Sequence, residues 1–408
     1  MDRQYGEQLL RNNTSYPSAI DTTFNKFWNW TRNYDLKWDL TKSLKFDFNA
    51  ANISRVDEPN GRIDNSEERD IIRKNIYKGG RTVDYRQSGN LSYQVPLNKI
   101  PLLDWTSLNV RYAFDYSWLA APSVFDSTTR SFKPNPILQN TIQNSNNKQA
   151  NLTLTMTQLY NKIPFFKRLT SNAPPAPKPK PEPPKSPNDT SKTAKPAVPK
   201  APSEINPIIK FAGKMVLMVK TIGVTFSETN GTALPGFKPR PQILGQDLDW
   251  KATDGSNSIA PGFGFGFGDQ SDIRVKAARN NWLTTDTLFN GQYARSFTQS
   301  FTGRSTLEPF TSCRIELNVQ RNFTRNQTES YRINANTGEY NAFNSLDGGS
   351  FSITTITWRT AFVKNNKDYT NETFTQFTNN RAIISQRLGL LNPYSTGQDS
   401  TGFWDGYS

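Results

Sequence analysis

The stretch "TSLNVRYAFDYSWLA" (Thr106–Ala120) alternates between apolar and polar side chains. Every even-numbered residue from Leu108 to Ala120 is apolar or aromatic, whereas the odd-numbered residues include Arg111 and Asp115. Successive side chains of a β-strand point to opposite faces of the sheet. The pattern therefore predicts a strand with one apolar face and one polar face.

The same period of two recurs along a chain that is otherwise polar. Only 35% of its 408 residues are hydrophobic, although 12% are aromatic, which argues against disorder. The formal net charge of +14 favours an anionic partner or surface without identifying one. Further alternating runs occur at Trp28–Leu40, Leu44–Ala50, Val83–Val95, Leu152–Met156, Ile222–Phe226, Tyr293–Phe301, Cys313–Phe323 and Ile356–Phe362.

The connections between these runs alternate between short and long, which indicates an up-and-down sheet. The expected short connections are Thr41–Ser43, Pro96–Trp105 and Gly303–Glu308. The expected long ones are Asp57–Gly80, Ala121–Lys148, Ser227–Gln292 and Arg325–Gly349. Short turns at one end and long loops at the other are typical of outer-membrane barrels. Two helices are also expected, one over Asn65–Tyr77 and one within Asn371–Leu391.

An apolar sheet face is buried either in the core of a soluble β-sandwich or in lipid. Aromatic residues near strand ends, long runs and mixed charges on the polar faces favour lipid and a water-filled interior. The predicted lumen-facing residues are Lys45, Asp47, Arg111, Asp115, Arg314 and Glu316. The predicted lipid-facing residues are Trp38, Phe46, Val110, Phe114, Ile315 and Leu317. Arg32 and Arg321 share the apolar parity, so we expect them toward the outer ends of their strands, where they reach headgroups.

The sequence offers no constellation for catalysis or metal binding. Histidine is absent and Cys313 is the single cysteine, which excludes intramolecular disulfides, Ser-His and Cys-His pairs. The glycine-rich "PGFGFGFGDQ" (Pro261–Gln270) lacks the spacing of a phosphate loop and is expected to pack its backbone closely. We therefore expect no enzyme activity and no cofactor, and the strand parity of the aromatics disfavours nucleic-acid binding.

Composition divides the chain into five expected segments. These are a lead-in (1–27), barrel strands and loops (28–171), a Pro/Lys-rich linker or insertion (172–207), further barrel strands with the long loop 227–292 (208–363), and a helical or loop segment (364–408). The segment 172–207 reads as an extended spacer on the short-turn side. The tetrapeptide "NKIP" occurs in Val95–Trp105 and again in Leu159–Leu169, which predicts one turn type used twice.

Several stretches resemble the SprA/Sov family of outer-membrane translocons. They are "VPLNKIPLLDW" (95–105), "PGFGFGFGDQSDIR" (261–274), "RNNWLTTDTLFN" (279–290), "LEPFTSCRIELNVQRN" (307–322), "KWDLTKSLKFDFNA" (37–50) and "RAIISQRL" (381–388). This family serves the type nine (type IX) protein secretion system and gliding motility of Bacteroidota. The resemblance covers most of the chain except the Pro-rich spacer, and the chain resembles an internal segment of the family protein.

The resemblance implies an all-β fold, namely part of a very large antiparallel transmembrane β-barrel in a Gram-negative outer membrane. It implies export of folded proteins from the periplasm to the cell surface. The implied partners are outer-membrane lipid, the remaining barrel strands from the same or another chain, secreted cargo with a C-terminal targeting domain, a shuttle barrel and a periplasmic plug. Two alternatives stay open, a soluble β-rich surface or adhesion protein and a basic nucleic-acid-binding protein.

Overall fold

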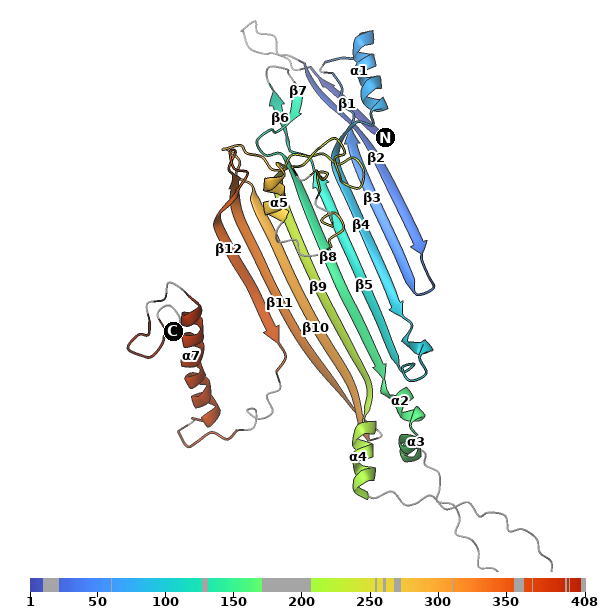
Figure 1. The fold of residues 1–408 in the computed structure, drawn as a ribbon, viewed down its shortest axis with the longest axis vertical. Helices are drawn as coiled ribbons and strands as arrows, with labels where there is room; N and C mark the ends of the chain where they lie inside the picture. Colours follow the sequence, from blue (N-terminus) through green and yellow to red (C-terminus); the bar gives the residue numbers. More distant parts are fainter. Residues whose placement is uncertain are drawn as a thin grey trace, which may run out of the picture. The chain divides into compact units, whose positions relative to one another are not determined.

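The computed structural model of the chain divides into two compact units, Met1–Ile353 and Thr354–Ser408 (Figure 1). The structure describes residues 1–9, 22–59, 61–126, 131–170, 207–253, 255–259, 262–267, 273–310, 312–355, 363–368, 370–392, 395 and 397–404. The expected strand Ile356–Phe362 and almost all of the Pro/Lys-rich segment 172–207 lie outside these residues.

The first unit is built on one ten-stranded antiparallel sheet. The strands lie in the order β1-β2-β3-β4-β5-β8-β9-β10-β11-β12, so each pairs with its neighbour along the chain apart from a separate β6–β7 hairpin. Their bounds are β1 Asp2–Gln8, β2 Thr23–Asp39, β3 Leu44–Arg55, β4 Arg81–Val95, β5 Thr106–Leu119, β6 Ser123–Asp126, β7 Ser131–Pro134, β8 Asn140–Thr155, β9 Val219–Phe237, β10 Gln292–Phe310, β11 Cys313–Ile333 and β12 Tyr340–Ile353.

The sheet confirms the coarse prediction of an antiparallel, β-rich fold. Half of the described residues are in strands and a fifth are in helices. Among the described residues the sheet is open, with β1 and β12 as its edges, and is not a closed barrel. The residues 1–27, expected as a lead-in, contribute β1 and the start of β2 to this sheet.

Four expected connections are wrong because the strands run further than their apolar pattern. The region Ala121–Lys148 contains the first half of β8, and β9 continues to Phe237. The expected turn Gly303–Glu308 lies inside β10, and Arg325–Gly349 is mostly paired strand around a turn at Asn334–Glu339. In β8 the extended part carries asparagines where alternation would require apolar residues, so the sequence hides it.

Helices cap both ends of the sheet. At the long-loop end lie α1 (Ser66–Tyr77) and α5 (Ile273–Arg279); at the short-turn end lie η1 (Leu97–Lys99), α2 (Met156–Lys162), α3 (Pro164–Thr170) and α4 (Pro207–Leu217) (Figure 1). The predicted helix at Asn65–Tyr77 is confirmed, because Asn65 and Glu68 form a capping box.

The two NKIP segments have different conformations, so the prediction of a shared turn type is wrong. The first forms η1, a 3-10 turn, whereas the second joins α2 to α3. They nevertheless meet at the short-turn end, where Lys162 Nζ donates to the Pro101 carbonyl at 2.6 Å and forms an ion pair with Asp104.

The second unit contains α7 (Glu372–Leu391), which confirms the helix expected within Asn371–Leu391. The Asn371 side chain accepts from the Phe374 backbone N–H at 2.8 Å and caps the helix N-terminus. Near the other end Trp404 lies against Gly389, and its backbone N–H donates to Ser385 Oγ at 2.8 Å.

Candidate membrane-facing surface

One face of the sheet is polar from β2 to β12. We call it the polar face. Its residues include Asp35, Asp47, Ser88, Asn90, Arg111, Asp115, Ser145, Gln149, Thr225, Ser227, Ser296, Ser300, Glu316, Asn322 and Ser350. A groove of about 850 Å³ runs across eight strands of this face, lined by small or polar residues such as Ala51, Ser117 and Gly231. Short side chains in adjacent strands therefore leave a continuous hollow across the strand direction.

The structure places all six predicted lumen-facing residues on this polar face. Asp47 and Arg111 both contact Asn90, with Arg111 Nε donating to Asn90 Oδ1 at 2.6 Å and Asn90 Nδ2 donating to Asp47 at 3.4 Å. Asp115 accepts from Ser145 Oγ at 3.3 Å.

The other three predicted lumen-facing residues also lie on the polar face. Lys45 lies 3.6 Å from Asp39 across the β2–β3 turn. Arg314 and Glu316 form an exposed ion pair at 2.9 Å on β11. The sheet thus gathers Lys45, Asp47 and Arg111 within three strands, and holds the β11 pair apart from them.

The opposite face has two halves, and its short-turn half is apolar on eight adjacent strands. We call this surface the apolar band. It comprises Tyr34, Leu36 and Trp38 (β2), Phe46 and Phe48 (β3), Leu91 and Tyr93 (β4), Leu108 and Val110 (β5), Ala150, Leu152 and Leu154 (β8), Ile222, Val224 and Phe226 (β9), Phe301 and Leu307 (β10), and Ile315, Leu317 and Val319 (β11). Trp38 is 57% exposed and Leu317 50%, so much of the band has no protein cover among the described residues.

The apolar band is oblique to the strands. The strand register links Leu36, the centre of the band on β2, to Arg325 on β11. The centre of the band on β11 is Leu317, eight residues nearer the short-turn end. That displacement is about 26 Å along the strand, and seven strand spacings cover about 34 Å. The band is therefore inclined by about 38° to the perpendicular of the strands, so strands crossing a layer parallel to the band would be tilted by the same angle from the layer normal. This lies within the tilt of about 35–45° that strands of membrane barrels have.

Polar residues follow the long-loop edge of the band on four strands. Arg32 follows Tyr34 on β2, Lys148 and Glu228 pair at 3.0 Å between β8 and β9, and Arg321 follows Val319 on β11. Arg321 Nη1 donates to Gln299 Oε1 at 2.8 Å. The expectation that Arg32 and Arg321 lie toward the outer ends of their strands is wrong, because Arg32 lies near the middle of β2 and Arg321 near the middle of β11. Both lie next to the last residue of the apolar band on their strand face.

The long-loop half of the same face is covered by the described residues within 238–291, which we call the covering loop. Phe263 packs edge-on to Tyr116 at 6.1 Å, Phe265 edge-on to Phe114 at 5.4 Å, and Phe267 stacks on Tyr112 at 5.3 Å. The alternating phenylalanines of the glycine-rich motif therefore match the alternating aromatics of β5. This confirms the expected packing role of that motif.

Amide side chains of the sheet hold the backbone of the covering loop. Asn146 Nδ2 donates to the Gly266 carbonyl at 2.6 Å, Gln87 Nε2 donates to Gly264 at 2.8 Å, and Asn144 donates to Phe263. These contacts satisfy loop carbonyls that would otherwise be buried without a donor. Sequence reasoning missed these amides, whose only signal is an amide on the apolar parity of a strand.

The covering loop overturns one prediction. Phe114, expected to face lipid, is only 4% exposed because its ring lies under Phe265 and over Gly89 of β4. A Cβ at Gly89 would overlap that ring, so the Phe114 side chain can occupy this position only because residue 89 is glycine. The other five predicted lipid-facing residues, Trp38, Phe46, Val110, Ile315 and Leu317, lie on the apolar band.

The covering loop closes the hydrophobic core of the first unit. Trp118, Ile142 and Leu234 from the sheet pack with Trp282 and Ala277 from the loop and α5. Lys238 Nζ donates to Asn281 Oδ1 at 2.6 Å, and burial lowers the pKa of this lysine. Arg274 of α5 also forms an ion pair with the buried Glu329 of β11.

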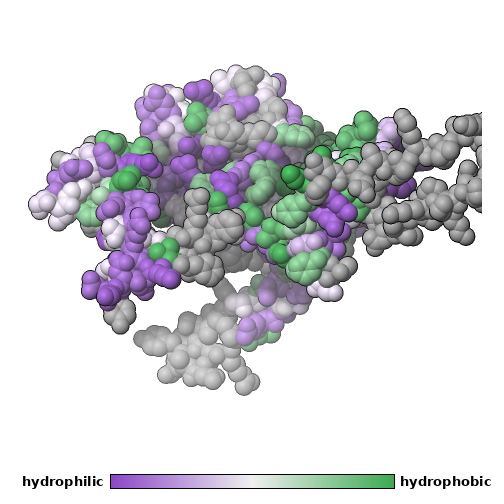
Figure 2. All heavy atoms as spheres, turned by 90° about the horizontal axis from the view of Figure 1, so that it is seen from below, coloured by the Kyte–Doolittle hydropathy of each residue, from purple (hydrophilic) through white to green (hydrophobic). Residues whose placement is uncertain are grey.

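The apolar surface continues onto the helices at the short-turn end. On α4, Ile208 and Phe211 are exposed, while Tyr160 of α2 donates to the Val216 carbonyl at 2.7 Å and so ties α4 to α2. Figure 2 views the molecule from this end, where green hydrophobic residues lie together beside purple hydrophilic ones. Sequence reasoning assigned this region to a turn and an insertion and missed its exposed apolar side chains.

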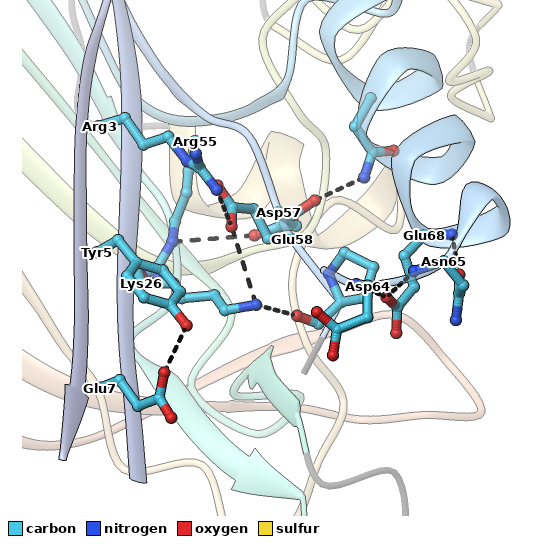
Figure 3. A network of polar contacts seen from close by, with 12 residues as sticks. Arg3, Tyr5, Glu7, Lys26, Arg55, Asp57, Glu58, Asp64, Asn65 and Glu68 are labelled. Atoms are coloured by element: carbon cyan, nitrogen blue, oxygen red, sulfur yellow. Dashed lines mark hydrogen bonds and ion pairs between the residues drawn. The ribbon is translucent and has the colours of Figure 1, made fainter. Parts of the chain in front are cut away.

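The long-loop end is polar by contrast. Arg3 of β1 donates to Glu58 at 2.7 Å, and Lys26 of β2 donates to the Pro59 carbonyl at 2.9 Å (Figure 3). Asp57 lies beside Arg55 (Figure 3). It is also bound by two donors of Arg81, at 2.8 and 3.1 Å. This network ties β1, β2 and the segment before α1 together.

Within the described parts of the chain, no helix is both long and apolar enough to cross a membrane. The same residues contain no group of three His, Cys, Asp or Glu side chains positioned to hold a metal ion. No protein-family model matches the chain, and no curated protein matches it.

Proposed function

We propose that this chain is a segment of an outer-membrane, protein-conducting translocon of the type nine secretion system, as its resemblance to the SprA/Sov family implies. In this proposal the apolar band faces outer-membrane lipid and the polar face lines a wide, water-filled lumen. Folded cargo passes through that lumen without any bond being made or broken.

The observation that carries this proposal is the inclination of the apolar band. A soluble sheet buries its apolar face against other protein, and a soluble monomer rarely leaves an apolar patch spanning many strands uncovered. A band of uniform direction across tilted strands is what a planar hydrocarbon layer selects, because every strand enters and leaves the layer at the same depth. The polar residues along its edge, Arg32, Lys148, Glu228 and Arg321, fit the level of the headgroups.

The open sheet supports a role as part of a larger barrel. An unpaired strand edge is untenable in lipid, since its backbone groups find no partner there. The edge strands β1 and β12 therefore pair, in this proposal, with further strands of the same barrel, from this or another chain. The proposed partners are those that the family implies: secreted cargo with a C-terminal targeting domain, a shuttle barrel and a periplasmic plug.

Cysteine labelling in native membranes tests the proposal. In a Cys313→Ser background, Val110→Cys and Arg111→Cys place thiols on opposite faces at the same depth. Membranes from cells that make the chain are treated with a membrane-impermeant maleimide or with a lipid-soluble one. We expect Arg111→Cys to react with the impermeant reagent and Val110→Cys to react only with the lipid-soluble one.

Equal reaction of both thiols with the impermeant reagent would contradict the proposal. Recovery of the chain in the soluble fraction, with both thiols reactive, would favour the alternative of a soluble surface or adhesion protein.

A further inference from the structure

A cationic pocket lies at the long-loop end of the sheet, on the same face as the apolar band. It has a volume of about 450 Å³. Four cationic residues line it, and Asp57 is its only carboxylate among the described residues. The lining comprises Arg32, Asn52, Asp57, Asn75, Lys78, Gly80, Arg81, Thr82, Arg240, Pro241 and Gln242. It thus joins β2, β3, the segment around α1, the start of β4 and the start of the covering loop.

The carboxylate in this pocket is already paired with arginine side chains. Asp57 accepts two hydrogen bonds from Arg81 and lies 4.0 Å from Arg55. The neighbouring acid Glu58 is bound by Arg3 and lies 3.9 Å from Lys26. The positive charges of Arg32, Lys78 and Arg240 are therefore not offset by the acids on this side of the pocket.

The remaining cations keep donors for a ligand. Lys78 and Arg240 are exposed, and neither side chain makes a hydrogen bond or ion pair within the described residues. The Nε of Arg32 is buried and meets no acceptor in that part of the chain. On the covering-loop side, Asp247 and Asp249 accept from the Gln242 amide, and Asp247 also accepts from the Arg240 backbone N–H at 3.1 Å. These two acids therefore accept from the Gln242 side-chain amide and the Arg240 backbone N–H, and not from the Arg240 guanidinium.

Arg32 is held in place by the sheet. Its Nη2 donates to Ser54 Oγ at 2.6 Å and to the Gly79 carbonyl at 3.3 Å, and its guanidinium lies 5.3 Å from the Trp30 ring centre. Several fixed or reachable donors around one cavity match a group with three anionic oxygens better than a single carboxylate.

We propose that this pocket binds a phosphate group, and that the phosphate belongs to a membrane lipid headgroup. The second part rests on the proposed function. Arg32 follows Tyr34 of the apolar band on the same strand face, and Trp30 lies directly beyond it. If lipid covers the band, the pocket opens where headgroup phosphates lie, and tryptophan is typical of that level.

A charge-matched pair of variants tests the proposal with the full chain in detergent micelles. Lys78→Gln/Arg240→Gln removes two exposed cations from the pocket. Lys37→Gln/Arg304→Gln removes two exposed cations from the polar face and serves as the control. Circular dichroism confirms that each variant keeps its β content. Native mass spectrometry measures binding of phosphatidic acid and of phosphatidylcholine, and calorimetry measures binding of inorganic phosphate.

We expect the unmodified chain to bind phosphatidic acid about tenfold more tightly than phosphatidylcholine. The pocket variant should lose about tenfold in affinity for phosphatidic acid and for inorganic phosphate, and the control should stay within about twofold. Equal losses in both variants, or no loss in either, would overturn the phosphate pocket.

The phosphate arm separates the two proposals. Binding of inorganic phosphate that depends on Lys78 and Arg240, without a preference for phosphatidic acid, would keep the phosphate site and overturn its assignment to a lipid. That result does not depend on whether the apolar band faces a membrane, which the cysteine labelling decides independently.

Discussion

The two halves of one sheet face carry the same alternating pattern and have opposite surroundings. In the long-loop half, Phe114, Tyr116 and Trp118 are at most 4% exposed beneath the covering loop. In the short-turn half, Trp38 and Leu317 are at least half exposed. Alternation in the sequence therefore indicates that one face of the strand is apolar. It does not indicate whether a protein segment covers that face.

The side chains between the aromatics distinguish the two halves. The covered half includes Gln87, Asn144 and Asn146 on the apolar parity, each donating to a carbonyl of the covering loop. The apolar band has no amide in its place. An amide within an apolar row therefore marks a surface that binds protein backbone, because a buried amide needs a partner that lipid does not offer.

Truncating a buried ring should produce the largest difference between the halves. We expect Phe114→Ala to lower the free energy of unfolding by about 3–5 kcal/mol, because it removes a ring packed between Phe265 and Gly89. The matched variant Leu317→Ala in the apolar band should cost less than about 1 kcal/mol in micelles. Urea unfolding in micelles measures both, and equal costs would mean that the two halves are buried alike.

Removing one amide should have the next largest effect. Asn146→Ala leaves the Gly266 carbonyl without its 2.6 Å donor, at a cost of about 2 kcal/mol. Hydrogen exchange should increase in residues 262–267. The control Asn151→Ala, on the polar face, loses no side-chain hydrogen bond within the described residues and should stay within about 0.5 kcal/mol. Unchanged exchange in the loop would mean that the aromatic contacts alone hold it.

A pair of glycines sharpens the same comparison. Gly266 has a φ of +67°, and a Cβ there would lie 2.8 Å from the Asn146 Cβ, so Gly266→Ala should cost about 1–1.5 kcal/mol. At Gly303, in the short-turn half, an added Cβ would make only ordinary contacts at 3.8 Å and beyond, so Gly303→Ala should be neutral or slightly stabilising. Thermal unfolding of both variants in micelles checks this, and a Gly303→Ala loss as large as that of Gly266→Ala would contradict it.

Much of the sheet could be predicted from the sequence because β2 to β5 and β8 to β11 each carry an apolar row over part of their length, whereas β1 and β12 carry none that was recognised. The helix α1 could also be predicted, since Asn65 and Glu68 stand at capping-box spacing. The first half of β8 was not, because Asn144 and Asn146 have the polarity of a loop. Their role depends on carbonyls more than a hundred residues further along the chain, and no local pattern records that distance.

The candidate site divides in the same way. The face of each predicted residue followed from strand parity alone, and all six residues assigned to the polar face lie on it. The burial of Phe114 did not follow, because parity cannot say which part of a face a distant loop covers. The inclination of the apolar band was also hidden, since it requires the register of seven strand pairs.

The smallest expected effect concerns the boundary between the halves. Lys148 and Glu228 pair at 3.0 Å there, with side chains 48% and 21% exposed. A double-mutant cycle with Lys148→Met and Glu228→Gln should give a coupling of about 0.5 kcal/mol that weakens as salt is added, as for pairs in contact with water. A coupling above about 2 kcal/mol that salt does not change would mean that the pair is desolvated. If the apolar band faces lipid as proposed, the hydrocarbon layer would then extend past Lys148 and Glu228 toward the covering loop, beyond the apolar side chains of the short-turn half.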